Sequence, residues 1–418
     1  MHGVGTRTDI TINRDHPVVL DITRLASRVG RGPLTGVDRV ELAYLNWCLQ
    51  DVSVPFYCLA RISGGYALLD REGALVFRSK LLGALPWGPS DLRARVSMKL
   101  PKGRRAAESD LRRLSIERSG RQGPPEISLP NGVYLNTGHS NLSKATLAGM
   151  RDSGLKVATL IHDMIPLDWP QFQRDGTVQS FEDKMRRAAD YSDLVIANSW
   201  HTQTRVKHYF DGWGAQAEYV TAFLGADPMR AEVAESASVR PYFVALGTIE
   251  PRKNHAFLLD IWEQLEVDHP TNQLPELYIV GRRGGKNEDG FKRLDQLKGN
   301  GWLFEHNNMQ DAEVRRLLSG SHGLLFPSLA EGFGLPSIEA AQLGVPVICG
   351  DLAIHREVLG DYPVYADLQD IYLWKKTILE QAEQRQKDLV HAYKAKKPKI
   401  PTWAEHFDAV NAVVTKLL

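Results

Sequence analysis

The sequence predicts an α/β protein made of two doubly wound, Rossmann-like domains that face a central cleft. Short apolar runs alternate with amphipathic segments along most of the chain, which is the pattern of parallel strands joined by crossover helices. The alternation stops near residue 225 and starts afresh near residue 242. A chain of 418 residues also exceeds the roughly 250–300 residues at which single cores stop growing. Two domains are therefore expected.

Five strands are expected in the first half, at Val18–Ile22, Val54–Ala60, Gly132–Asn136, Val157–His162 and Leu194–Asn198. Between the first two, apolar residues recur at helical spacing from Val37 to Trp47. The second half repeats the pattern, with strands at Tyr242–Gly247, Leu277–Gly281, Trp302–Phe304, Leu324–Pro327 and Val345–Cys349. A helix with Phe257, Ile261 and Leu265 on one face is expected after the first of these.

The linker between the domains is expected from Gly225 to Pro241, where apolar periodicity is lost and two X-Pro pairs occur. The first domain then spans residues 1–230 and the second spans residues 240–400. A last amphipathic helix, 403–418, follows the breaks at Pro398 and Pro401. Open α/β sheets bind ligands beyond the carboxyl ends of their strands, so motifs that directly follow strands are the candidates for a site.

Composition indicates a globular protein that folds without disulfides, because 43% of the residues are hydrophobic and 24% are charged. The three cysteines, Cys48, Cys58 and Cys349, are odd in number and lack metal-ligand spacing, which favours a reducing compartment. Residues 1–15 contain no apolar signal region, and no run approaches about 20 apolar residues. We expect a cytoplasmic protein, at most peripheral to the inner face of the cell membrane.

The net charge of +1 argues against a nucleic-acid-binding protein. Residues 91–122 are nevertheless basic, with ten cationic and four acidic side chains. The cations are Arg93, Arg95, Lys99, Lys102, Arg104, Arg105, Arg112, Arg113, Arg118 and Arg121. This basic region, 93–121, is a candidate contact for an anionic membrane surface or an acidic glycan, and a solvated helix and loop is the alternative.

The most specific motif runs from Phe326 to Glu339. Pro336 suits the first turn of a helix, so the preceding glycines form a loop that leads into it. Free amides at a helix start bind oxygen atoms of a sugar or phosphate, and two carboxylates, Glu331 and Glu339, flank this loop. In the alternative interpretation, Glu339 complements the helix dipole and Glu331 caps a turn.

Two further motifs follow strands. The adjacent cations Arg252 and Lys253 stand between a strand and a helix, where they can neutralise a diphosphate, or where they are surface cations at a turn. His162 and Asp163 end an apolar strand, a place where a histidine serves either structure or function.

A glycine-rich loop from Gly30 to Arg39 follows the first strand. It is neither a Walker loop nor a dinucleotide fingerprint, because the residues that define those motifs are missing. A flexible glycine turn is the alternative to a ligand contact. Weaker candidates also follow strands, namely 281–285, 306–309 and 136–139.

The segment Glu-Gly-Phe-Gly-Leu-Pro followed by Glu339 closely resembles the signature of retaining glycosyltransferases of family 4, which have the GT-B fold. The resemblance is strong from about Phe243 to Tyr365. It implies that Glu331 and the amides after it hold the donor sugar, and that Glu339 binds the nucleotide ribose. The donor-binding residues implied are Gly247, Thr248, Arg282, Met309, Gly332, Phe333, Gly334, Leu335 and Glu339.

The same resemblance assigns the other motifs. Glu-Pro-Arg-Lys-Asn is similar to a variant of the family's diphosphate clamp, although many relatives have Arg where this sequence has Thr248. Lys253 then contacts the diphosphate, with Arg252 as the substitute cation. His162 would contact the donor sugar near the anomeric carbon, oriented by Asp163. The implied catalytic residues are therefore His162, Arg252, Lys253 and Glu331, and the implied acceptor or loop contacts are Gly36, Asp38, Arg39, His139 and Asp163.

As a family member, the chain would move a hexose or deoxyhexose, with mannose on GDP favoured, from a nucleotide diphosphate sugar to a hydroxyl of a glycan or lipid-linked acceptor. Retention at the anomeric carbon, no metal and no cofactor are implied, and no Asp-x-Asp metal motif is present. Bacterial surface polysaccharide synthesis is the setting implied. The resemblance would also return helix 403–418 to the first domain, whereas a helix that completes the second domain is equally compatible with the sequence. A sugar-nucleotide epimerase of the same fold and a catalytically silent glycan-binding or scaffold protein are the alternatives.

Overall fold

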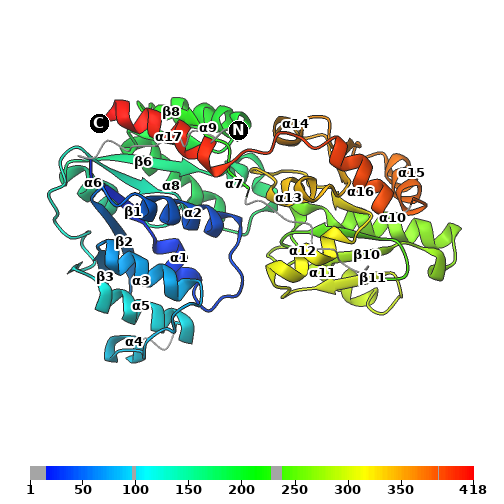
Figure 1. The fold of residues 1–418 in the computed structure, drawn as a ribbon, viewed down its shortest axis with the longest axis horizontal. Helices are drawn as coiled ribbons and strands as arrows, with labels where there is room; N and C mark the ends of the chain where they lie inside the picture. The colour runs from blue at the N-terminus through cyan, green and yellow to red at the C-terminus, as the bar shows by residue number, and fades with distance from the viewer. Residues whose placement is uncertain (1–15, 97–99, 227–237, 385) are drawn as a thin grey trace, which may run out of the picture.

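The computed structural model describes residues 16–96, 100–226, 238–384 and 386–418. Two α/β domains lie side by side along the long axis of the molecule (Figure 1). The expected absence of a signal region concerns residues 1–15, which lie outside the described residues, as does most of the expected linker.

The N-terminal domain is built on an eight-stranded sheet in the order β4-β3-β2-β1-β5-β6-β7-β8. Its strands are β1 (Val18–Asp21), β2 (Phe56–Ile62), β3 (Gly65–Leu69), β4 (Glu117–Ser119), β5 (Gly132–Asn136), β6 (Leu155–Ile161), β7 (Leu194–Ala197) and β8 (Glu218–Thr221). The five expected strands are present within a few residues. The sequence interpretation missed the edge strands β4 and β8 and the antiparallel strand β3, which lies between β4 and β2.

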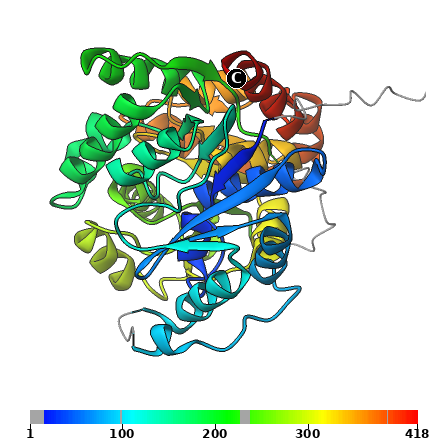
Figure 2. The ribbon, with the colours of Figure 1, turned by 90° about the vertical axis from the view of Figure 1, so that its left-hand side faces the viewer.

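Helices flank this sheet, as the view onto the N-terminal domain shows (Figure 2). They are α1 (Thr23–Arg28), α2 (Gly36–Gln50), α3 (Arg71–Leu81), α4 (Leu92–Val96), α5 (Lys102–Leu114), α6 (Lys144–Asp152), α7 (Ile165–Asp168), α8 (Thr177–Tyr191) and α9 (Trp200–Gly212), with a 3-10 turn at Pro170–Phe172. Helix α2 begins with a capping box in which Thr35 and Asp38 satisfy each other's backbone amides. That cap fixes where the glycine-rich loop ends.

The C-terminal domain has a fully parallel six-stranded sheet in the order β11-β10-β9-β12-β13-β14. Its strands are β9 (Tyr242–Leu246), β10 (Glu276–Val280), β11 (Leu303–His306), β12 (Gly323–Phe326), β13 (Val347–Cys349) and β14 (Val364–Tyr365). The helices are α10 (His255–Asp268), α11 (Glu288–Gln296), α12 (Asp311–Ser319), α13 (Leu335–Leu343), α14 (Ala353–Leu359), α15 (Ile371–Ala382) and α16 (Gln386–Ala395), with 3-10 turns at Pro251–Lys253 and Thr271–Gln273. This strand order is that of a Rossmann sheet, in which the chain reverses direction across the sheet between β9 and β12.

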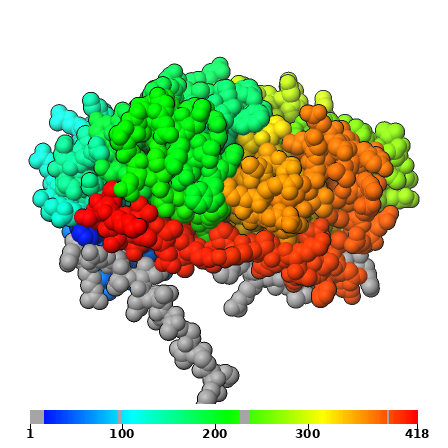
Figure 3. Space-filling model, turned by 90° about the horizontal axis from the view of Figure 1, so that it is seen from above, coloured from blue at the N-terminus to red at the C-terminus, as the bar shows by residue number. Residues whose placement is uncertain are grey.

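The last helix, α17 (Trp403–Leu417), lies against the N-terminal domain. Figure 3 shows the red segment that carries the chain there from the C-terminal domain. The Phe407 ring stacks on the Trp47 ring of α2, with centroids 4.4 Å apart. His406 Nδ1 lies 3.1 Å from the carbonyl oxygens of Ala222 and Phe223, and its Nε2 lies 2.8 Å from the Tyr44 hydroxyl. Because a carbonyl only accepts, Nδ1 carries the proton and the Tyr44 hydroxyl donates to Nε2.

Much of the basic region is neutralised within the N-terminal domain. The buried Arg104 pairs with Glu108 at 2.8 Å, and the buried Arg112 pairs with Asp91 at 2.6 Å. Exposed cations do remain, at Arg93, Lys102, Arg113, Arg118 and Arg121, while Lys99 lies outside the described residues. The charge excess counted along the sequence thus overstates the charge at the surface. In the part of the chain that the structure describes, no helix has the length and apolar character needed to cross a membrane.

We predict that Phe407→Ala will detach α17. The side chain is 5% exposed and joins two aromatic contacts on α2, so its removal should cost about 3–5 kcal/mol of unfolding free energy. Denaturant unfolding followed by tryptophan fluorescence measures the loss. Asp408→Ala, on the exposed side of the same helix, is the control, and equal stability of the two variants would contradict the prediction.

Candidate active site

The candidate site forms where strand order reverses in the C-terminal sheet. The loop that follows β9 carries Arg252 and Lys253, and the loop that follows β12 carries Glu331. Since β9 and β12 are neighbours whose connections leave in opposite directions, a crevice opens between their carboxyl ends. Side chains that are 78 residues apart in the sequence meet there.

A buried ion pair joins Lys253 Nζ to Glu331 Oε1, and the two side chains are only 9% and 6% exposed. Arg252 approaches the other carboxylate oxygen at 3.5 Å and donates to the carbonyl of Ala330 at 3.0 Å. Burial by itself would raise the pKa of Glu331, but the charges of Lys253 and Arg252 outweigh it and lower this pKa to about 2. Glu331 is therefore a carboxylate at neutral pH, held between two cations.

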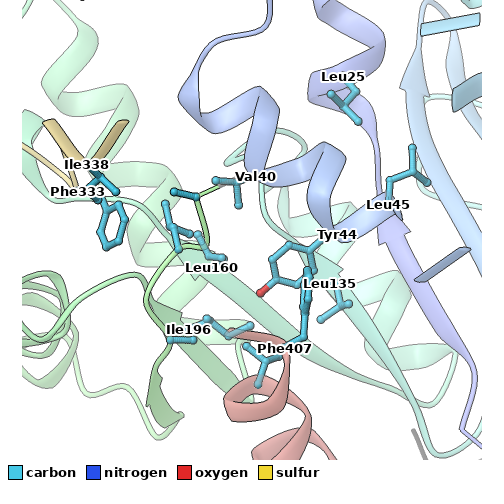
Figure 4. Packing of buried hydrophobic residues seen from close by; sticks show 14 of the residues in the cluster. Leu25, Val40, Tyr44, Leu45, Leu135, Leu160, Ile196, Phe333, Ile338 and Phe407 are labelled. Carbon is cyan, nitrogen blue, oxygen red and sulfur yellow. The ribbon is translucent and has the colours of Figure 1, made fainter. Parts of the chain in front are cut away.

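Gly332 marks the closest approach of this loop to the N-terminal domain. A Cβ atom there would lie 2.9 Å from the carbonyl oxygen of His162 and 3.0 Å from an oxygen of Asp163. The loop ends at Gly334, which has a left-handed backbone with φ of 85° and precedes α13. Phe333 extends into the core shared with Val40 of α2 (Figure 4). Glycine at 332 thus lets the two domains meet at the site.

His162 stands at the end of β6, on the opposite side of this contact, and is 6% exposed. Its Nε2 lies 2.7 Å from the carbonyl oxygen of Thr137, so this nitrogen carries the proton. Burial lowers the pKa of His162 to about 4, which makes the imidazole neutral at physiological pH. Asp163 accepts from the amide of Ile165 at 3.1 Å, and burial raises its pKa. The expectation that Asp163 orients His162 is corrected, because the Thr137 carbonyl holds the ring.

The glycine-rich loop meets the C-terminal domain through three contacts. Arg39 Nη1 lies 2.5 Å from Glu339 Oε1, which joins α2 to α13. Gly36 faces the side chain of Leu335, and the Arg282 guanidinium donates to the carbonyl of Arg31. The residues implied as ligands of one donor therefore do lie along one interdomain surface.

Asp38 does not face the cleft, which corrects its expected role as an acceptor or loop contact. Its side chain is fully buried and pairs with Arg24 at 2.7 Å and Arg28 at 2.9 Å. It also accepts from the amide of Thr35 at 2.7 Å. A buried carboxylate with three donors is a structural anchor, and it holds two arginines that the sequence interpretation had missed.

His139 is a neighbour of His162 and is held by the backbone. Its Nε2 lies 3.0 Å from the carbonyl oxygen of Leu160, and the two imidazole rings are 5.0 Å apart. Burial lowers its pKa well below the ordinary value, so it too is neutral. His139 packs beside His162 and has a backbone φ of 52°.

The remaining implied donor contacts surround the same crevice. A Cβ at Gly247 would lie 3.4 Å from Lys253, so glycine there leaves room for the cation. Thr248 is exposed and its methyl group lies next to Gly284. Arg283 pairs with Glu305 and Asp295, which leaves the neighbouring Arg282 as the arginine directed to the N-terminal domain. Met309 is half-buried against the main core.

Glu41 of α2 is a wholly buried carboxyl group that sequence reasoning missed. Its Oε1 accepts from the amide of Leu25 at 2.8 Å, whereas Oε2 has no partner among the described residues and lies against Gly138. Burial, followed by the charge of Asp21, raises its pKa well above the ordinary value. The sequence did contain an indication of this buried carboxyl group, because Glu41 interrupts the apolar helix face formed by Val37, Val40 and Tyr44.

We predict that Glu41→Gln stabilises the protein at neutral pH. The folded pKa lies above the unfolded value of about 4.5, so the folded chain holds the extra proton and loses stability as pH rises above 4.5. An amide of the same shape removes that loss. Unfolding free energies measured from pH 4 to 8 should coincide at the acid end and diverge in favour of the variant at higher pH. Parallel curves would contradict the raised pKa, and Glu126→Gln, at an exposed position, serves as control.

Two facing Rossmann-like domains with a cationic loop and a glycine loop at the strand reversal place the chain in the GT-B class of folds. Residues 230–396 match the sequence model described as "Glycosyl transferases group 1". The C-terminal domain is therefore similar in sequence to the group 1 glycosyl transferases.

Curated relatives are mannosyltransferases from Escherichia coli. The chain is 30% identical to "Serotype-specific mannosyltransferase WbdA" over 236 residues. This aligned region covers 52% of the present chain and 28% of the relative. The chain is 25% identical to "O-antigen chain mannosyltransferase B" over 224 residues. This aligned region covers 52% of the present chain and 58% of the relative. The chain thus spans less than two thirds of the length of either relative.

Solved structures show the same fold along nearly the whole chain. The complex of Anabaena Alr3699/HepE with UDP and glucose superposes with a TM-score of 0.58 and 14% identity, covering 95% of this chain and 98% of that one. Sucrose-phosphate synthase from Thermosynechococcus elongatus gives a TM-score of 0.58 and 15% identity, covering 96% and 99%. At this level of identity the likeness establishes the GT-B fold alone.

Proposed function

We propose that this protein is a glycosyltransferase that moves a hexose, with mannose favoured, from a nucleotide diphosphate sugar to a hydroxyl of a glycan or lipid-linked acceptor. The observation that carries the proposal is the cluster of Lys253, Arg252 and Glu331 at the strand reversal, opposite His162. The mannosyltransferase relatives support the choice of sugar and a role in bacterial surface polysaccharide synthesis. We place the reaction at the inner face of the cell membrane.

The proposed reaction retains the configuration at the anomeric carbon. The bond from that carbon to the diphosphate oxygen breaks, while the acceptor oxygen forms its bond on the same face. The acceptor proton passes to the leaving phosphate oxygen. Arg252 and Lys253 stabilise the charge that develops on the diphosphate, together with the free amides at the start of α13.

The other residues position the donor in this proposal. Glu331 and the amides of residues 332–335 hold the sugar, while Glu339 takes the ribose hydroxyls. The backbone carbonyl of His162 lies beside Gly332, and we propose that the neutral imidazole of this residue contacts the sugar from the N-terminal domain. We propose that the reaction needs no metal and no cofactor, because two cationic side chains already face the position of the diphosphate.

We predict that Lys253→Ala abolishes transfer at temperatures where the variant is still folded, and that it lowers stability because it leaves the buried Glu331 unpaired. Loss of the cation that faces the diphosphate should lower kcat by at least about 100-fold, which corresponds to roughly 3 kcal/mol of transition-state stabilisation. Transfer is measured with radiolabelled GDP-mannose and a mannoside acceptor, beside circular dichroism. Lys375→Ala, whose partner Asp268 lies on α10, is the matched control. An active Lys253→Ala enzyme would disprove the proposed clamp.

We also predict that a nucleotide diphosphate sugar raises the melting temperature without any added metal. A ligand at 100 times its Kd stabilises the folded state by about 2.7 kcal/mol. A thermal-shift screen of GDP-, UDP- and dTDP-sugars should give its largest shift with GDP-mannose. The shift and the activity should persist in EDTA, and activity that returned only with a divalent ion would contradict the metal-independent route.

A further inference from the structure

A large cavity runs along α2 away from the strand reversal. Its volume is about 970 Å³, at the upper end of the range of about 300–1,000 Å³ for small-molecule pockets. One end is bounded by Arg39, which pairs with Glu339, and by Leu335, the first residue of α13. The other end reaches Gln50, eleven residues further along α2, which is about 16 Å at 1.5 Å per residue. We call this cavity the α2 groove. It is longer than a single sugar ring.

The lining of the α2 groove includes aromatic rings and planar polar side chains. Trp47 comes from α2, Trp87 follows α3, and Trp403 begins α17, and all three are half-buried. Asn46 and Gln50 of α2 also line the groove. An indole offers an apolar face to the C–H face of a pyranose, while amide groups donate to and accept from its hydroxyls. This combination suits a carbohydrate.

The charges in the α2 groove favour a neutral occupant. Arg28 is paired with Asp38 at 2.9 Å, and Arg39 is paired with Glu339 at 2.5 Å. The remaining charged side chains of the lining are one cation, Arg315, and one anion, Asp311. An anionic ligand would therefore find little net positive charge. The Asn46 amide oxygen already accepts from Arg78, but an alkyl chain would bury the Gln50 amide without giving it a hydrogen-bond partner, which is costly.

We infer that the α2 groove binds the sugar chain of the acceptor, so that the enzyme recognises a neutral oligosaccharide several rings long. The inference rests on the proposed glycosyltransferase function and adds an extended acceptor site to it. The end of the chain that receives the new sugar lies beside Arg39 and Leu335. The rings already added lie on Trp47 and Trp87. Longer acceptors then bind more tightly than a single sugar because they occupy more of the groove.

The test compares methyl α-mannoside with α-mannotetraose, both as acceptors for GDP-mannose and as ligands titrated against the intrinsic tryptophan fluorescence. The parent should show a KM and a Kd for the tetrasaccharide at least about tenfold below those for the monosaccharide. Trp87→Ala should abolish this difference, with the KM for the monosaccharide and the hydrolysis of GDP-mannose unchanged. Gln50→Ala, at an exposed helix end, should reduce the difference with no effect on folding. Trp200→Ala, a tryptophan that is 58% exposed on α9, is the matched control.

The transfer assay and the binding titration together distinguish failure of the inference from failure of the proposed function. If no sugar nucleotide is turned over but α-mannotetraose binds the parent and not Trp87→Ala, the proposed function fails and the groove stands. If the parent transfers mannose without a preference for length, or if both groove variants keep the preference, the inference is overturned. Binding of polyprenyl phosphate vesicles that is lost in Trp87→Ala, with unchanged binding of the tetrasaccharide, also overturns it.

Discussion

The ion pair between Lys253 and Glu331 is the contact on which the arrangement of the site depends. Either charge alone, at less than a tenth exposure, would cost several kcal/mol. The loops that follow β9 and β12 can therefore bury their charged ends only if they meet. The pair also keeps Lys253 cationic against a burial that lowers its pKa, so a positive charge is ready for an anionic ligand.

A second carboxylate at the site is paired across the cleft. Glu339 on α13 accepts from Arg39 on α2, and these residues are 300 positions apart in the sequence. If ribose hydroxyls bind Glu339, they must share this carboxylate with Arg39 or displace it. Charge-assisted hydrogen bonds are about twice as strong as neutral ones, so this exchange has a cost. Under the proposed function, binding of the donor at Glu339 would therefore act on the contact that joins α2 to α13.

Sequence reasoning found the interior parallel strands and the motifs that follow them, because both depend on local patterns. The apolar run of β5 is bounded by residues that are polar or turn-forming, and its expected limits, Gly132–Asn136, match the structure. The short edge strands β4 and β8 offered no such run, since β4 reads Glu-Arg-Ser. A strand of this kind is defined by its partner, which a sequence pattern does not contain.

The residues of the candidate site also fall into two groups, those that the local sequence predicts and those whose positions depend on tertiary contacts. The sequence pattern of glycines and charged residues from Glu331 to Glu339 is enough to predict a ligand-binding loop. The structure places Glu331 at the strand reversal. The orientation of His162 depends instead on the carbonyl of Thr137, which lies 25 residues away on another strand end. Asp38 is predicted to be a loop contact because it follows the glycines. In the structure its side chain is buried and forms ion pairs with Arg24 and Arg28. Such pairings follow from tertiary contacts and have no local signature.

The buried polar groups beside β1 and β5 explain why the turn that holds His162 is fixed in one conformation. Both His139 and Asn141 have a positive φ, of 52° and 60°, which non-glycine residues keep only when their surroundings require it. The Asn141 amide donates to Asp21 at 2.7 Å, and Glu41 fills the space beside Gly138 so closely that no side chain fits there. The turn therefore cannot relax without breaking these contacts. Its strain fixes the carbonyl of Thr137, and that carbonyl sets the direction in which His162 faces the cleft.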